Sequence, residues 1–268
     1  MSYKIALDSG HGLYTIGKRC DKTIDPNETR EWVLNNRIAV FIEEGLKAYT
    51  GYELIRTDDR TGKTDVSRPE RCKRANKFKA DIFISLHANA AEKKFSGGGI
   101  VTYVCKGLSE NGTTRTLQKD LYNRLIQHTG LKGNRAKTLG QYNYDVLVLT
   151  DMPAILCELG FMNSTVDTPI ILTEEFAKQS AQAFIEFFVE HGKLKKINKE
   201  VIEDKPAVPE PEPIAPEEPK EEVLPTEPDN NKTEDKETDA PETSEKQTPT
   251  ILSVLRYLLK LIIEWAEG

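Results

Sequence analysis

The sequence lacks several features that would place it in a membrane or in a disulfide-stabilised fold. It contains no run of about 18 uninterrupted apolar residues, so we expect no conventional membrane span. Its first residues, MSYKIALDSGHG, lack the charged region, apolar stretch and small-residue cleavage site of a secretory signal, which predicts synthesis in the cytoplasm without a signal peptide. The four cysteines include no CxxC pair, and we expect reduced thiols at Cys20, Cys72, Cys105 and Cys157.

The charge is distributed unevenly along the chain. The 268 residues carry 37 Lys and Arg against 43 Asp and Glu, a net charge of −6. Residues 200–246 hold 17 acidic and 5 basic side chains, whereas residues 1–199 have a net charge of +6. The basic part carries no nucleic-acid-binding fingerprint, so we expect no nucleic acid as a partner.

Proline marks a boundary between three parts of the chain. Ten of the 14 prolines fall between Pro206 and Pro249, interleaved with acidic residues. Such a segment buries too little apolar surface to offset the entropy of the chain and favours an extended linker. We therefore predict a folded domain at 1–192, an acidic Pro-rich linker at 193–248 and a separate C-terminal segment at 249–268.

The C-terminal segment has the pattern of an amphipathic helix. Within and just beyond residues 250–266, one narrow stripe is polar and the rest is apolar; the stripe consists of Ser253, Arg256, Lys260, Glu264 and Glu267. A helix of about 17 residues would be about 25 Å long, shorter than a bilayer core. We expect self-association of this segment, with membrane-surface contact or docking onto another protein as alternatives.

Residues 1–192 alternate between strand and helix patterns. Short apolar runs predict buried strands, and apolar residues at helical spacing predict helices between them. The predicted strands are 3–9, 52–57, 80–88, 97–104 and 152–160, and the predicted helices are 31–49, 67–78, 113–128 and 173–191. This order indicates an α/β fold with a mostly parallel twisted sheet flanked by helices.

Three ionisable residues are predicted at the ends of strands. His11 follows the first strand, in DSGHG; His87 ends the second strongly apolar strand, in ISLHAN; and Glu158 ends the last strand, in ILCELGF. Carboxyl ends of parallel strands meet at one edge of a sheet, where ligands bind. Two histidines and a carboxylate with an open position are the ligand set of a hydrolytic zinc site.

The identity of the carboxylate ligand stays open on residue patterns alone. A single histidine or glutamate at such a position is also compatible with a structural hydrogen bond or ion pair, and a glutamate at a helix start suits the helix dipole. The candidates are Asp8, Asp21, Asp25, Glu28, Glu31 and Glu158.

Four segments together resemble a known family. The segments DSGHG, REWVLNNRIA, RCKRANKFKADIFISLHANA and PAILCELGFMNS are similar to the zinc-dependent N-acetylmuramoyl-L-alanine amidases called amidase family 3. The resemblance runs from about Lys4 to Glu190. It implies that His11, Glu31 and His87 bind Zn²⁺ and that Glu158 is the catalytic carboxylate. Trp32 and Val33 depart from the family's usual polar residues after the glutamate, which keeps Glu28 as an alternative ligand.

The resemblance also implies a substrate and a route to it. These enzymes cut the amide between N-acetylmuramic acid and L-alanine in bacterial peptidoglycan. The net charge of +6 on residues 1–199 suits binding to an anionic cell wall. A protein made in the cytoplasm would act on the wall after release, as a phage endolysin or an autolysin does. Two alternatives stay open: a wall-binding module without catalysis, and a zinc peptidase that acts on the stem peptide.

Other residues near these motifs have structural explanations. Cys157 is expected to pack in the core rather than act as a nucleophile. Arg71 lies four residues before the dipeptide Ala75–Asn76, as an arginine does in the family that the chain resembles, and suits either an ion pair or substrate contact. His128 and His191 lie near predicted helix ends and are interpreted as structural.

Overall fold

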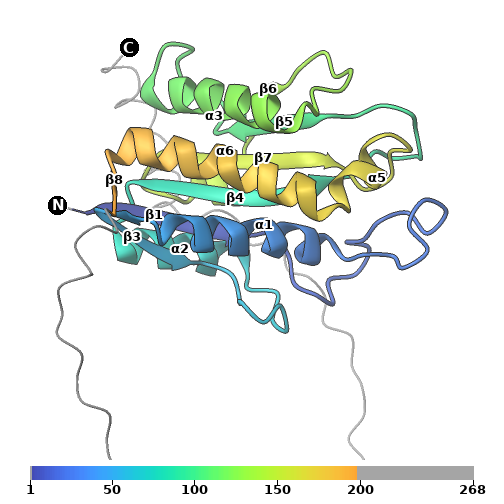
Figure 1. Cartoon of the computed structure of the whole chain (residues 1–268), viewed down its shortest axis with the longest axis horizontal. Helices are drawn as coiled ribbons and strands as arrows, with labels where there is room; N and C mark the ends of the chain where they lie inside the picture. Colours follow the sequence, from blue (N-terminus) through green and yellow to red (C-terminus); the bar gives the residue numbers. More distant parts are fainter. Residues whose placement is uncertain (1, 198–268) are drawn as a thin grey trace, which may run out of the picture. The chain divides into compact units, whose positions relative to one another are not determined.

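A computed structural model describes residues 2–197 of the chain (Figure 1). The predicted C-terminal helix at 249–268 and all but the first five residues of the predicted linker lie outside this range. Within it, residues beyond the predicted boundary at 192 still contact the folded body. Leu194 is buried, and β8 (Lys195–Lys196) pairs antiparallel with β2 (Tyr49–Thr50). In the described part of the chain, no helix is long and apolar enough to cross a membrane.

A six-stranded sheet forms the centre of the fold. All neighbouring strands are parallel except β5 and β7, which are antiparallel. The strand order is β3 (Tyr52–Arg56), β1 (Tyr3–Ser9), β4 (Ile82–Asn89), β7 (Ala154–Phe161), β5 (Ile100–Val104) and β6 (Leu139–Gln141). The predicted mostly parallel sheet is confirmed. The central strands β4 and β7 are buried almost throughout, as expected for a sheet covered on both faces.

Three long helices lie side by side over one face of the sheet (Figure 1). The helix α6 (Glu174–Gly192) packs between α1 (Glu31–Leu46) and α3 (Thr113–Thr129). On the other face, α2 (Arg68–Phe78) packs against the short α4 (Asp145–Val148). The short α5 (Asp167–Ile171) contacts both β7 and α6. Thr173 caps α6, because its hydroxyl accepts a hydrogen bond of 3.1 Å from the Phe176 amide.

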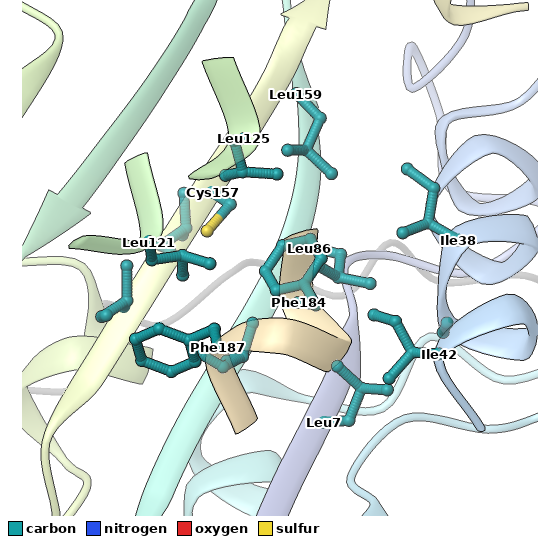
Figure 2. Packing of buried hydrophobic residues seen from close by; sticks show 14 of the residues in the cluster. Leu7, Ile38, Ile42, Leu86, Leu121, Leu125, Cys157, Leu159, Phe184 and Phe187 are labelled. Atoms are coloured by element: carbon teal, nitrogen blue, oxygen red, sulfur yellow. The ribbon is translucent and has the colours of Figure 1, made fainter. Parts of the chain in front are cut away.

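The core between the sheet and the three helices is apolar and close-packed. Figure 2 shows side chains of β1, β4 and β7 meeting those of α1, α3 and α6. Leu7 and Leu86 contribute from the sheet, and Phe184 and Phe187 contribute from α6. Cys157 points into this cluster and is fully buried, which confirms its predicted place in the core. All four cysteines are buried thiols.

The structure differs from the predicted elements mainly at their ends. The helix expected to reach Tyr49 ends at Leu46, because Tyr49 belongs to β2. The strand expected from Gly97 begins at Ile100, because Gly98 and Gly99 adopt φ values of 138° and 98° that belong to a turn. The elements β2, β6, β8, α4 and α5 have only two to five residues each and were not predicted.

Candidate metal centre

His11, Glu31 and His87 come together from three different elements. His11 follows β1, Glu31 is the first residue of α1, and His87 lies near the end of β4. Each offers one ligand atom within 4.8 Å of the others. The Glu31 carboxylate lies between the two imidazoles, with Oε2 3.4 Å from His11 Nε2 and Oε1 3.0 Å from His87 Nδ1.

The backbone before His11 is shaped for close approach to His87. A Cβ on Gly10 would lie only 2.1 Å from His87 Cε1, so residue 10 must be glycine for the two strands' ends to meet in this way. His11 itself has a φ of 66°, an uncommon conformation for a residue with a side chain. Asn35 of α1 donates a hydrogen bond of 3.4 Å to the Gly10 carbonyl. The turn that presents His11 is therefore fixed from the helix as well as from the sheet.

Arg71 fixes the same turn from the other face of the sheet. Its guanidinium donates to the carbonyls of Ser9 at 2.7 Å and His11 at 3.0 Å, and it forms a buried ion pair of 2.7 Å with Asp8. Burial alone would raise the pKa of Asp8, but Arg71 and the hydroxyl of Ser85 hold it below its usual range. Arg71 is buried, so the structure places it in an ion pair rather than at a substrate surface.

The Glu31 carboxylate is buried, ionised and incompletely hydrogen-bonded. Its Oε1 accepts from the Ala88 amide at 3.2 Å, whereas its buried Oε2 has no hydrogen-bond donor. Burial would raise the pKa of Glu31, but the hydrogen bond and charge of His87, with smaller contributions from His11 and Lys18, lower it. Burial lowers the pKa of His11 to about 4, so its imidazole is neutral at pH 7 and able to bind a metal.

These three residues fit a zinc ion. Zinc in proteins is bound tetrahedrally by histidine nitrogen and carboxylate oxygen at about 2.0–2.2 Å, which puts two ligand atoms about 3.4 Å apart. The separation of Glu31 Oε2 from His11 Nε2 has this value. The same Oε2 is the buried atom without a donor, and a cation would satisfy it.

The other carboxylates considered from the sequence lie elsewhere. Glu28 pairs with Arg19 at 3.2 Å and does not join the cluster of His11, Glu31 and His87. Asp8 is bound by Arg71. Asp21 accepts from its neighbour Thr23, and Asp25 accepts from the amides of Asn27 and Thr29.

Glu158 lies beside the cluster of His11, Glu31 and His87 without belonging to it. It pairs in register with His87 on β4 and with Val101 on β5. Contrary to the prediction, it does not end its strand, because β7 continues to Phe161 past an irregularity in the β4–β7 register. Its Oε2 is buried without a hydrogen-bond partner. Burial is the main reason that its pKa rises to about 7, and the charge of Glu31 raises it further.

Residues near Glu158 that the sequence did not single out come from the neighbouring strands and loops. Tyr103 on β5 forms a T-shaped ring contact with Tyr144, which in turn contacts the exposed Tyr142. Burial, followed by the charge of Glu158, raises the pKa of Tyr144 to about 12. Lys18 lies 3.8 Å from the Glu31 carboxylate. Lys18, Tyr103 and Tyr144 are far apart in the sequence and follow no common spacing, so only the tertiary structure shows that they lie near one another.

The two remaining histidines have structural partners. His128 contacts the Glu186 carboxylate at 2.8 Å, and His191 contacts that of Asp120 at 2.9 Å. Both contacts join α3 to α6, which agrees with the structural interpretation of these histidines.

Comparison with known proteins connects this site with one family. The sequence profile of a family described as N-acetylmuramoyl-L-alanine amidase matches residues 5–188, which include all four site residues. A sporulation-specific N-acetylmuramoyl-L-alanine amidase of Bacillus subtilis (strain 168) is 29% identical over 194 residues, 72% of this chain and 69% of its own. An endolysin of Bacillus phage SPP1 is 28% identical over 204 residues, 73% of this chain and 68% of its own. An uncharacterised 38.4 kDa protein of Clostridium perfringens is 30% identical over 208 residues, which are 76% of this chain and only 55% of that protein.

Solved structures show the same fold. The catalytic domain of CwlV, an N-acetylmuramoyl-L-alanine amidase from Bacillus (Paenibacillus) polymyxa var. colistinus, superposes with a TM-score of 0.61 at 25% identity, covering 73% of this chain and all of that domain. An N-acetylmuramoyl-L-alanine amidase from Clostridium difficile 630 superposes with a TM-score of 0.62, covering 71% of this chain and 96% of its own, and at 23% identity shows the fold alone. Together with the matched profile, which spans more than half of the chain, these likenesses show that the chain belongs to the N-acetylmuramoyl-L-alanine amidase family of hydrolases.

Proposed function

We propose that the protein hydrolyses the amide bond between N-acetylmuramic acid and L-alanine in bacterial peptidoglycan, with one Zn²⁺ held by His11, Glu31 and His87. The observation that carries this proposal is the cluster of two imidazoles around a buried carboxylate oxygen that has no donor. The amidase family of the chain supplies the substrate class. The Bacillus amidase and the phage endolysin that the chain resembles support action on the cell wall.

The residues of the chain divide the chemistry between them. A bound zinc ion supplies a water of lowered pKa and polarises the carbonyl oxygen of the amide. Glu158 lies opposite His87 and accepts the proton of the attacking water, since a carboxylate with a pKa of about 7 is a useful base near neutral pH. The resulting carboxylic acid then returns the proton to the leaving amine. Leu156, two residues before Glu158 on the same face of β7, is buried and limits the access of water to Glu158 from that side.

Identification of the new amino terminus tests this function. Purified peptidoglycan is digested with the full-length protein, and the new α-amino groups are labelled and identified. New L-alanine termini that disappear with a zinc chelator and return with added Zn²⁺ support the proposal. A different new terminus would instead indicate a zinc peptidase acting on the stem peptide. Retention of the protein on the wall without any new terminus would indicate a binding module.

Glu158→Gln provides the matched control in the same assay. The variant keeps the three ligands and a side chain of the same shape, so it should still bind Zn²⁺ and pellet with the wall. It should release no alanine termini. Cleavage at the wild-type rate by this variant would contradict the role given to Glu158.

A further inference from the structure

The backbone of a short loop between α3 and β6 packs directly against the backbone of a glycine-rich turn that precedes β5. The loop comprises residues 131–135, and the turn comprises residues 97–99. The Asn134 amide donates to the Gly98 carbonyl at 3.3 Å, and the Asn134 side chain accepts from the Gly98 amide at 3.1 Å. A Cβ on Gly133 would lie 2.0 Å from the Gly98 carbonyl oxygen, so the close approach requires glycine. The loop therefore has a fixed position relative to the sheet.

This position places Arg135 over an aromatic ring at the end of β7. The guanidinium carbon lies 4.9 Å from the centroid of the Phe161 ring, and that ring makes an edge contact with Phe95 at 5.2 Å. Phe161 is buried, and its amide donates at 3.0 Å to Asp167, which also accepts from the Gly99 amide at 2.7 Å. The ring under Arg135 is thus anchored to the same turn that anchors the loop.

Arg135 and Glu158 act on the same part of the sheet. Val101 pairs with Glu158, and Tyr103, two residues further along β5, lies on the same face. Burial and the charge of Glu158 raise the pKa of Tyr103, whereas the charge of Arg135 lowers it. Arg135 is exposed, and no carboxylate pairs with it within residues 2–197.

We propose that Arg135 binds the free carboxylate on the second residue of the stem peptide, on the amine side of the bond that is cut. The inference rests on the proposed function and adds a determinant of substrate choice to it. Glu158 and Phe161 pair with His87 and Asn89 on β4, which are two residues apart, about 7 Å at 3.3 Å per residue, and two extended peptide residues span this distance. A guanidinium that stacks on an aromatic ring has a fixed orientation, which favours a bidentate ion pair with a carboxylate.

Two soluble muramoyl peptides test the inference. They are identical except that the second residue carries a carboxylate in one and a carboxamide in the other. With the zinc-loaded full-length enzyme, Arg135→Ala should lower kcat/KM for the carboxylate substrate by about 10- to 100-fold, mainly through KM. The same change should alter kcat/KM for the carboxamide substrate by less than about threefold. Arg135→Lys should retain part of the preference, because lysine keeps the charge but not the planar fork.

Lys137→Ala is the matched control. Lys137 is exposed on the same connection between α3 and β6, and its loss changes the net charge equally. It should leave both substrates unaffected. Equal losses on both substrates with Arg135→Ala, or no loss on either, would overturn the inference while the amidase activity stands. If the wild-type enzyme releases no alanine terminus from either peptide, the proposed function fails and the inference fails with it.

Discussion

His87 and Glu158 lie directly opposite each other on the parallel strands β4 and β7. The register puts a predicted metal ligand and a predicted base on the same face, at a distance fixed by the backbone hydrogen bonds of the sheet rather than by a loop. Glu31 approaches His87 from the helix side, so that the imidazole has a carboxylate on each of two sides. A site on such rigid elements keeps its geometry when one side chain is changed, which makes single substitutions informative.

The first prediction concerns catalysis by Glu158. Glu158→Gln removes the proton acceptor while preserving size, and kcat should fall by about 10²- to 10⁴-fold, the usual contribution of a general base. Zn²⁺ content should stay at the wild-type level because His11, Glu31 and His87 are untouched. Release of alanine termini and metal analysis of the same preparation check both parts. Loss of the metal together with activity would show that Glu158 supports the ligands instead.

The second prediction concerns the pH dependence of stability in the metal-free protein. The folded-state pKa of Glu158 is raised from 4.5 to about 7, so the folded state holds its proton more tightly than the unfolded state does. The contribution of Glu158 to the free energy of unfolding is therefore fully present below pH 4.5 and is lost as the pH rises through 7. Relative to Glu158→Gln, the wild-type protein should lose about 2–3 kcal/mol between pH 5 and pH 8.

Urea unfolding of both proteins in chelator, at pH 5, 6, 7 and 8, measures this difference. Subtraction of the variant removes the contributions of Glu31 and His87, which titrate in both proteins. A difference that stays constant across these pH values would mean that the Glu158 carboxyl is not desolvated in the folded state.

The third prediction separates the two glutamates that the sequence left as alternatives. Glu31→Gln should abolish the rise in Tm that excess Zn²⁺ gives, which corresponds to about 4 kcal/mol at a thousandfold excess over Kd. Glu28→Gln should leave that rise intact, because Glu28 only pairs with Arg19 at the surface of the loop. Thermal unfolding with and without Zn²⁺ compares them directly. The opposite result would transfer the ligand role to Glu28.

Much of this architecture follows from hydrophobic periodicity. The strands ending in DSG and in ISLHAN are predicted because their apolar runs are long and are followed by polar residues. The family resemblance read from four segments is confirmed by the match over residues 5–188. The short elements escaped prediction, because two to five residues are fewer than a periodic pattern needs. The antiparallel direction of β5 follows from residues 90–99, which join it to β4 as a loop without a crossover helix and carry no periodic signal.

The site was predictable only in part. His11, His87 and Glu158 stand at or near strand ends, and the rule about such ends indicates that they meet. Glu31 was chosen through the resemblance, because a glutamate at a helix start has an equally good explanation in the helix dipole. Arg135 and Tyr103 carry no local signal. Tyr103 lies on the same face as Glu158 because β5 pairs with β7, and Arg135 lies over Phe161 because a loop rests on a glycine turn.

The last prediction concerns Gly10, which has no functional group and yet controls the site. Gly10→Ala would bring a Cβ to 2.1 Å from His87 Cε1, and the imidazole would have to move away from Glu31. We expect loss of Zn²⁺ binding and of activity, with a fold that survives because the core on the opposite face is unchanged. Gly17→Ala is the control: its Cβ meets nothing within 4 Å, so it incurs only the strain of a φ of 74°, about 1 kcal/mol. A Zn²⁺ titration measures the metal affinity of both variants, and their far-UV circular dichroism spectra show whether the fold is retained. A Gly10→Ala protein that binds Zn²⁺ as tightly as Gly17→Ala would show that His87 has room to retreat without leaving the metal.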